Sequence, residues 1–195
     1  MSGFIFKMLF VVGSLLCIHA SWLPAKAWLS QELIHHSWQQ SMDQQQKQTS
    51  DKSGKRVVIK PWPWADTFPI AALSFKRLQK DIVVLNGGDP TTLAFSAGAV
   101  APFNQTNSNK PFVVAGHRDS HFDFLEDILM KDVISMTDQN GDSQLYQVEA
   151  IDIVDASSGQ LPLLADDNSL VLITCYPFDS IENTNERYVI TARLL

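Results

Sequence analysis

From about residue 56 to its C-terminal end, the chain is a series of short β-branched and apolar runs separated by turn-forming residues. Runs of about four to eight such residues, bounded by Gly, Asn, Asp or Pro, are typical of β-strands. Two separators are strong turn signals, NGGD at 86–89 and DQNGD at 138–142, and the second predicts a hairpin. The expected strands are 56–60, 68–75, 81–85, 111–115, 133–137, 144–154, 170–175 and 187–194.

Helical signals in the same region are few. Residues 91–97 predict one or two helical turns, with Thr91 near the cap. Asp119 or Ser120 could cap a helix over 121–130, whose apolar face would hold Phe122, Leu125 and Leu129. About eight short strands with so little helix predict a mainly β fold, either a closed barrel or a sandwich.

The N-terminal segment has the layout of an export element. Lys7 precedes an apolar stretch from 8 to 18 that continues to Leu23, and no acidic residue occurs before Glu32. An A-x-A sequence at 25–27 predicts cleavage of a signal peptide. Extended back to Phe4, the same run reaches the ~20 residues that an uncleaved membrane anchor needs. Both alternatives stay open.

Between this segment and the strands lies an accessory region. Five apolar residues at near-helical spacing predict a short amphipathic helix that either lies on a membrane or packs on the domain: Trp28, Leu29, Leu33, Ile34 and Trp38. Residues 39–55 are polar and Gln-rich and predict a stalk. The expected division is therefore 1–27 as signal peptide or anchor, 28–55 as helix and stalk, and 56–195 as the folded domain.

Charge and cysteine content exclude some classes of protein. A formal net charge of −6 gives no electrostatic support for nucleic-acid binding. The two cysteines, Cys17 and Cys175, exclude a disulfide framework, because Cys17 falls inside the apolar N-terminal run. Cys175 is then left without a partner, either as a small buried hydrophobe or as a reactive thiol.

Three polar residues at the ends of expected strands could form a catalytic group. His117 follows the run 112–116, Cys175 ends the run 170–174, and Arg187 begins the last strand. A free thiol has a pKa of about 8.5, so a nearby imidazolium would raise its thiolate fraction. The imidazole could then protonate a leaving amine, and a guanidinium could stabilise the oxyanion of a tetrahedral intermediate. This combination fits acyl transfer through a thioester.

Several sequence strings resemble those of the sortases, cysteine transpeptidases that join proteins bearing a sorting signal to amines. The strings LITC at 172–175 and RYVI at 187–190 resemble the paired motifs of the whole family. Longer strings resemble the Gram-negative branch called class GN, or marine proteobacterial-type, sortases: KPWPWADT at 60–67, AGHRDSHF at 115–122 and TCYPFD at 174–179. The resemblance extends from about residue 60 to the C-terminal end, with the strings in the same order.

The resemblance implies an eight-stranded sortase-type β-barrel. It also implies Cys175 as nucleophile, His117 as acid and base, and Arg187 as the residue that stabilises substrate and oxyanion. The substrate would be an exported protein with a C-terminal LPxTG-like sorting signal, and the resemblance leaves the amine acceptor unidentified. No cofactor is expected, and the chain is expected at the inner membrane with its catalytic domain in the periplasm. The family usually has Thr where this chain has Val171, which departs from the pattern away from the reacting atoms.

Other functions remain as alternatives. The thiol could serve a hydrolytic cysteine peptidase. His117 and His121, four residues apart, could bind a metal in a periplasmic hydrolase together with neighbouring carboxylates: Asp119, Asp123, Glu126 and Asp127. A periplasmic binding module would use an aromatic platform of Trp62, Trp64 and Tyr176. Arg118 is assigned no role; as a strand neighbour of His117 it is expected to point elsewhere, toward Asp119 or Asp123.

Overall fold

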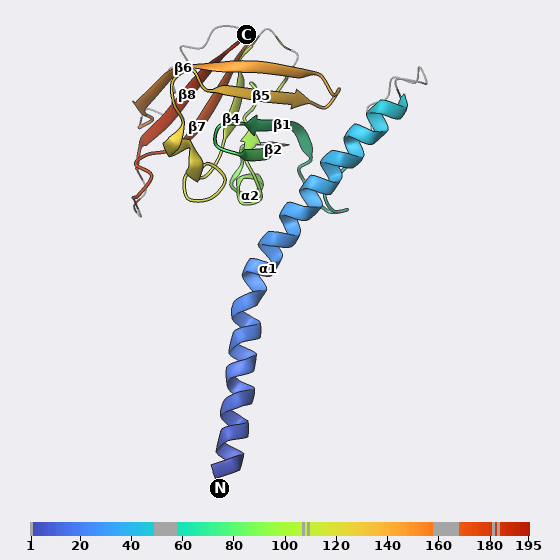
Figure 1. Cartoon of the computed structure of the whole chain (residues 1–195), viewed down its shortest axis with the longest axis vertical. Coiled ribbons are helices and arrows are strands. Elements are labelled where there is room, and N and C mark those ends of the chain that lie inside the picture. Colours follow the sequence, from blue (N-terminus) through green and yellow to red (C-terminus); the bar gives the residue numbers. More distant parts are fainter. Residues whose placement is uncertain are drawn as a thin grey trace.

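The computed structural model describes residues 2–48, 58–106, 108, 110–157, 168–180, 182 and 184–195. In this part of the chain, eight strands form one closed barrel in the order β1-β2-β3-β4-β7-β8-β6-β5, with a long N-terminal helix beside it (Figure 1). The prediction of a mainly β, closed eight-stranded barrel is confirmed. The elements are α1 (Ser2–Gln48), β1 (Pro69–Phe75), β2 (Lys80–Asn86), α2 (Pro90–Leu93), β3 (Gly98–Ala99), β4 (Phe112–Ala115), η1 (Asp123–Asp127), β5 (Val133–Asp138), β6 (Ser143–Asp155), β7 (Ser169–Cys175) and β8 (Glu186–Leu194).

The predicted hairpin at 138–142 joins β5 and β6, which pair antiparallel. The Asp138 carboxylate accepts hydrogen bonds from the backbone N–H groups of Asn140 at 2.8 Å and Asp142 at 3.0 Å. Gly141 has φ of 84°, a left-handed conformation that glycine adopts at little cost. The turn residues thus satisfy their own backbone and fix the register of this half of the barrel.

Strand β7 lies between β4, which runs parallel to it, and β8, which runs antiparallel. Its alternate residues contribute to two apolar clusters, one in the barrel interior and one on the outer face. The inner cluster includes Val114, Leu170, Leu172 and Ile190, and the outer one is Val113, Val171, Ile173 and Val189. Because both faces are covered, the sequence of β7 is a continuous apolar run that shows no alternation.

The segment expected as a helix over 121–130 contains only η1, a 3-10 helix of five residues. Its N-cap is Phe122, without a side-chain cap, so neither Asp119 nor Ser120 caps it. A 3-10 helix places residues three apart on one face, and this face is buried in the barrel interior: Phe122, Leu125 and Ile128. Leu129, expected on the apolar face, is 58% exposed. Core packing at a spacing of three therefore overrides the α-helical pattern.

In the described part of the chain, the run predicted as a strand at 56–60 is not seen as one, and the barrel contains a strand that was not predicted. Residues 58–60, the described part of the run 56–60, are not in a strand. The remaining strand is β3, which pairs parallel with β2 and antiparallel with β4. A Cβ at Gly98 would lie 1.9 Å from the carbonyl oxygen of Gly87, so only glycine allows this close backbone approach. A two-residue strand of small residues has no periodicity from which it could be predicted.

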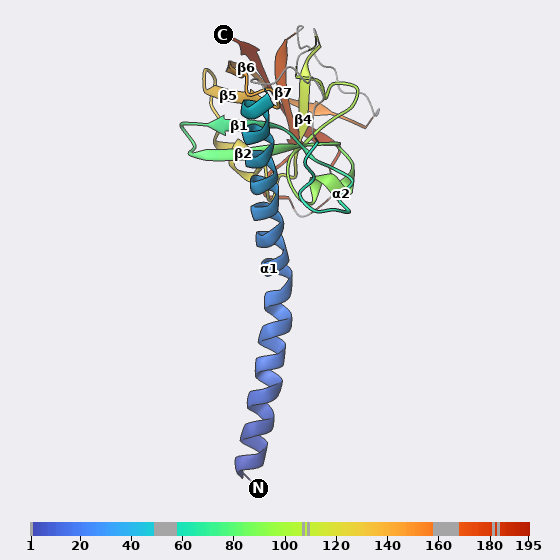
Figure 2. The ribbon, with the colours of Figure 1, turned by 90° about the vertical axis from the view of Figure 1, so that its right-hand side faces the viewer.

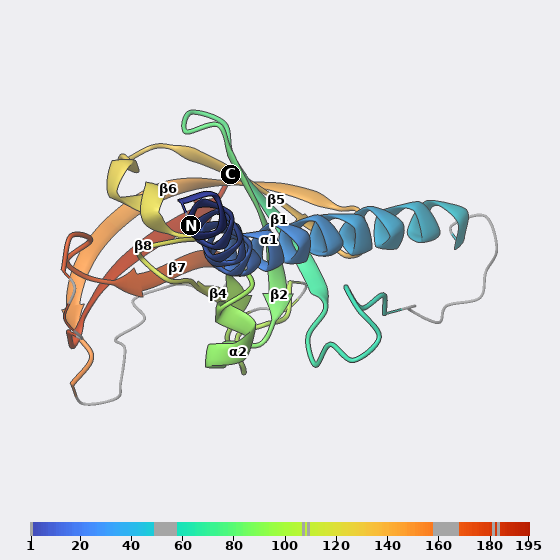
Figure 3. The same ribbon diagram turned by 90° about the horizontal axis from the view of Figure 1, so that it is seen from below.

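Helix α1 continues without interruption through the regions expected as export segment, amphipathic helix and the first part of the stalk. Among the described residues of the chain, one helical stretch is apolar and long enough to cross a membrane, namely residues 6–45 of α1. Its later part contacts β1 and β2 (Figures 2 and 3). Ile34 is fully buried there against Val83 and Leu85, with three aromatic residues packed around them: Trp38, Trp62 and Phe95. The functional division at residues 27 and 55 stays a prediction.

Candidate functional site

The ends of β4 and β7 bring His117 and Cys175 to the same level of the barrel. In the parallel pair, Ala115 is in register with Ile173, and the N–H of Gly116 donates to the carbonyl of Ile173 at 3.1 Å. The Thr174 hydroxyl then donates to the carbonyl of Gly116 at 2.8 Å. His117 therefore follows β4 at the end where Cys175 ends β7.

Arg187 reaches this level from the other side of β7. It is the register partner of Cys175 in the antiparallel β7–β8 pair, and the N–H of Tyr176 donates to the carbonyl of Glu186 at 3.1 Å. Side chains of directly opposed residues in an antiparallel pair lie on one face, with Cβ atoms about 4.5–5.5 Å apart. The three residues singled out from the sequence therefore lie at the adjacent ends of β4, β7 and β8.

The three side chains lie at the surface of the barrel. His117 is exposed, whereas Cys175 and Arg187 are half-buried, and Cys175 is a free thiol. By the alternation of β7, Cys175 shares a face with Val171 and Ile173 of the outer apolar cluster. The thiol is thus accessible and lies at the end of an apolar strip.

The segment after β4 is folded around one aromatic ring. Phe122 is fully buried, and its N–H donates to the carbonyl of His117 at 2.9 Å, which closes the turn 117–122. A Cβ on Gly116 would lie 2.7 Å from this ring, so a side chain there would displace it. Glycine before His117 is needed because the ring packs directly on the backbone.

The guanidinium of Arg187 is partly committed to the chain itself. Its Nη1 donates to the carbonyl oxygens of Thr184 at 2.7 Å and Glu186 at 2.9 Å. A guanidinium carries five N–H donors. Among the described residues, its hydrogen bonds all use Nη1, so the N–H groups on Nε and Nη2 are available to a ligand.

Arg118 has a structural position that sequence reasoning did not predict. Its Nη2 donates to the carbonyl oxygens of Ser180 at 2.5 Å and Glu182 at 2.8 Å, in the loop between β7 and β8, and not to Asp119 or Asp123. Its Nη1 is buried without a hydrogen-bond partner in the described part of the chain. Arg118 therefore connects the segment that follows His117 to the loop that follows Cys175. A partner 62 residues away leaves no sequence signal.

Aromatic packing fixes the start of the same loop. Tyr176 stacks on Tyr188 with ring centroids 6.0 Å apart, and Phe178 meets Tyr188 edge-on at 5.1 Å. Burial raises the pKa of the Tyr188 hydroxyl. Trp62 instead contacts Phe95 beneath α1. The platform of Trp62, Trp64 and Tyr176 is thus not assembled, because Trp62 and Tyr176 pack into different clusters.

The residues considered for a metal site are also dispersed. Within the described residues, no group of three or more His, Cys, Asp or Glu side chains could hold a metal ion. Burial lowers the pKa of His121, which hydrogen-bonds the Ala94 backbone, whereas His117 is exposed at the strand end. This geometry does not support the metal-dependent alternative.

Comparison with known proteins identifies a family. The family model described as "Sortase domain" matches residues 73–195. Sortase D of Bacillus subtilis (strain 168) is 23% identical over 145 residues, which cover 74% of this chain and 71% of that protein.

Solved structures agree with this match. A lid mutant of Sortase A from Corynebacterium diphtheriae superposes with a TM-score of 0.57 at 26% identity, over 68% of this chain and 73% of that one. A Clostridium perfringens Sortase D5 transpeptidase superposes with a TM-score of 0.60 at 16% identity, over 82% of this chain and 99% of that one. The second likeness shows the fold alone.

Proposed function

Since the chain belongs to the sortase family of transpeptidases, which act on proteins bearing a sorting signal, we propose that it forms a thioester at Cys175 with an LPxTG-like C-terminal signal and transfers the acyl group to an amine. The observation that supports this proposal is the strand register, which pairs Cys175 with Arg187 and ends β4, the strand before His117, beside β7. The class GN assignment rests on the strings at 60–67, 115–122 and 174–179.

The proposed first half-reaction is acylation. The Cys175 thiolate attacks the carbonyl carbon of the scissile amide, and the carbonyl oxygen becomes an oxyanion. The free N–H groups of Arg187 donate to that oxyanion, which suits a cation that stays charged throughout. As the C–N bond breaks, the His117 imidazolium gives its proton to the leaving amine. The product is a thioester between Sγ and the acyl group.

The second half-reaction reverses these roles. The acceptor amine attacks the thioester carbonyl, loses a proton to the neutral His117 imidazole, and the C–S bond breaks to return the thiolate. No cofactor takes part in either step.

The N-terminal helix supports the proposed location. An apolar helix of sufficient length beside Lys7 suits delivery across the inner membrane, with the barrel in the periplasm. Recovery of the whole chain in the soluble cytoplasmic fraction would contradict this location. The alternatives of hydrolytic peptidase and binding module gain no specific support from the geometry of the site.

The decisive test is the intact mass of the protein after incubation with a synthetic sorting-signal peptide. We expect a trapped acyl adduct that hydroxylamine releases, and an amide product when an amine is added. Cys175→Ala should give no adduct, whereas Cys17→Ala, the matched loss of the other thiol, should leave the adduct unchanged. Undiminished peptide cleavage by Cys175→Ala would end the thioester proposal, and release of free acid despite added amine would favour hydrolysis.

A further inference from the structure

A cavity lies at the end of the barrel away from Cys175. Its wall is formed by the ends of four neighbouring strands, β4, β7, β8 and β6, and by the connection between β3 and β4. The strand residues that line it are Phe112, Gln144, Tyr146, Ser169 and Leu194. Its volume is about 290 Å³, close to the ~300 Å³ at which small-molecule pockets begin, and the mouth of a barrel is one of the places where such pockets occur.

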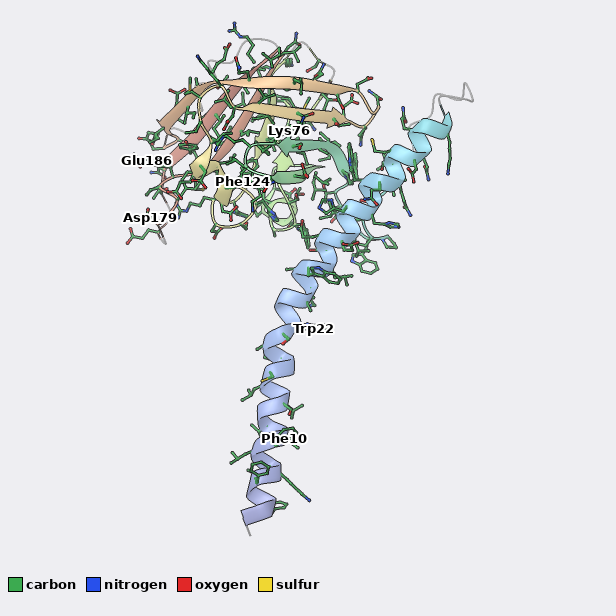
Figure 4. The ribbon with its side chains drawn as sticks, viewed as in Figure 1. Phe10, Trp22, Lys76, Phe124, Asp179 and Glu186 are labelled. Atoms are coloured by element: carbon green, nitrogen blue, oxygen red, sulfur yellow. The ribbon has the colours of Figure 1, made fainter. Side chains whose placement is uncertain are left out.

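The length of the strands separates this cavity from the candidate catalytic site. Ser169 begins β7 and Cys175 ends it six residues later, and a rise of ~3.3 Å per residue makes this separation roughly 20 Å. Strand β8 spans the same distance in the opposite direction: Glu186 at its start lies at the lower left of Figure 4, whereas the C-terminus lies at the top of Figure 1. The cavity is therefore a second site and not an extension of the first.

The described lining of the cavity is polar in a particular way. Apart from Phe112 and Leu194, each described lining residue carries a hydroxyl, a carboxamide or an ammonium group, and none carries a carboxylate. Hydroxyl and carboxamide groups each donate and accept hydrogen bonds. The hydroxyls of a sugar ring also do both, so this mixture of groups matches a sugar better than it matches an apolar ligand or a bare ion.

Several of these groups have hydrogen-bonding capacity that the described part of the protein does not use. The Tyr146 hydroxyl donates to Oε1 of Gln144 at 2.8 Å. Within the described residues, the amide N–H groups of Gln144 and the lone pairs of the Tyr146 oxygen then have no partner, and the Asn168 carboxamide forms no hydrogen bond. A ligand that enters the cavity thus finds both donors and acceptors around it.

Lys110 supplies the one charge in the described lining, and its ammonium forms no ion pair within the described residues. The Asp138 carboxylate, 3.5 Å from the Thr106 hydroxyl, does not line the cavity and accepts N–H groups of its own turn. A single ammonium balances a single negative charge. A phosphate monoester carries about −1.5 to −2 charges at pH 7, whereas a carboxylate carries one, so the charge of the lining favours a carboxylate.

We propose that this cavity binds a sugar that carries one carboxylate, such as a uronic acid residue of a glycan. The carboxylate pairs with the Lys110 ammonium, and the ring hydroxyls bond to the unused groups of Gln144 and Tyr146. Phe112 and Tyr146 belong to the barrel core and give the cavity a rigid floor. Because the cavity and the thiol lie at opposite ends of the barrel, a bound glycan leaves Cys175 free, and the site does not depend on the proposed reaction.

The test measures the binding of three small ligands to the full chain in detergent by isothermal titration calorimetry. Methyl β-glucuronide has both the ring and the carboxylate, methyl β-glucoside lacks the carboxylate, and acetate lacks the ring. We expect the glucuronide to bind several-fold more tightly than either of the others. Absence of glucuronide binding, or equal affinity for the glucoside or for acetate, would overturn the proposal.

Lysine variants test the charge. Lys110→Gln removes the ammonium from an exposed position and should lower the affinity for the glucuronide several-fold, toward that of the glucoside. Lys76→Gln removes the same charge from the β1–β2 connection (Figure 4) and should leave the affinity unchanged. An unchanged affinity in the Lys110→Gln protein, or an equal loss in both proteins, would overturn the role of Lys110 and with it the proposal.

A second pair of variants tests the place. Ser108 lines the cavity, so Ser108→Trp should fill it and abolish glucuronide binding, with a melting temperature close to that of the parent. Ser157→Trp makes the same change at an exposed position beyond the other end of β6 and should bind normally. Cys175→Ala should also bind the glucuronide normally. Retained binding in a folded Ser108→Trp protein, or lost binding in the Cys175→Ala protein, would show that the sugar binds elsewhere and overturn the proposal.

Discussion

Arg187 has hydrogen-bond donors that its own loop does not use, and these determine what its loss should do. Its Nη1 donates to the carbonyls of Thr184 and Glu186, while the other guanidinium nitrogens form no hydrogen bond within the described part of the chain. Arg187→Ala should therefore leave a folded barrel but lower the turnover number about 10²–10³-fold, as for the loss of one oxyanion donor. Arg187→Lys should recover little, because a single ammonium lacks the planar fork. Steady-state cleavage of a sorting-signal peptide measures both effects.

Arg193 provides the control on the same strand. It forms an exposed ion pair with Glu149 at 3.1 Å, and exposed pairs contribute little to stability, at most about 1 kcal/mol. Arg193→Ala should therefore retain normal turnover and a normal melting temperature. An inactive Arg193→Ala protein beside an active Arg187→Ala protein would show that the oxyanion donor had been assigned to the wrong arginine.

Between elements, Arg118 links the end of β4 to the loop that follows β7. Because one nitrogen of its guanidinium serves both Ser180 and Glu182, loss of the side chain frees the loop beside the thiol. We expect Arg118→Ala to raise KM for a sorting-signal peptide several-fold and to slow iodoacetamide alkylation of Cys175, with a melting temperature close to that of the parent. Arg118→Lys should recover part of the KM effect, because one donor can still reach a carbonyl.

The matched control for Arg118 is Arg77. Its guanidinium also donates to a backbone carbonyl of a distant segment, that of Asp127 at the end of η1 at 2.5 Å, and it pairs with Asp132, but Arg77 lies in the β1–β2 connection. Arg77→Ala should leave KM and alkylation unchanged. Equal kinetic effects from the two arginines would mean that Arg118 contributes only general stability and does not position the site.

Elements differ in how far the sequence predicts them. The hairpin at 138–142 follows from local chemistry, because Asp138 and Gly141 satisfy the turn without help from elsewhere. The 3-10 turn η1 and the two-residue strand β3 do not, since core packing of Phe122 and the close approach of Gly98 to Gly87 decide them. The three candidate site residues could be singled out from the sequence because they follow, end or begin strong strands, whereas the contacts of Arg118 depend on a loop far along the chain.

For the whole molecule, the main result beyond the barrel is that α1 is part of the packed structure. The sequence pattern of Leu33, Ile34 and Trp38 predicted an apolar helix face but left open what covers it. The structure places Ile34 in one cluster with Val83 and Leu85, so the helix and barrel share a small core. A tether would allow the barrel to turn freely relative to α1, whereas a shared core fixes the barrel relative to the apolar part of α1.

This shared core leads to a stability prediction for the full chain. Replacing a buried Ile by Ala typically costs about 2–5 kcal/mol, because transfer free energy is lost and a cavity remains. Ile34→Ala should fall at the low end, roughly 2 kcal/mol, since the cluster around it is small and a helix can settle into the gap. Leu29→Ala, at a position 51% exposed on the same helix, should change stability by less than about 0.5 kcal/mol. Thermal unfolding of the barrel in detergent, followed by near-ultraviolet circular dichroism, measures both variants. Because Trp62 and Phe95 of the barrel border Ile34, the aromatic signal reports unfolding at the contact itself. Identical melting temperatures for Ile34→Ala, Leu29→Ala and the parent would mean that α1 is only a tether and that the barrel folds without it.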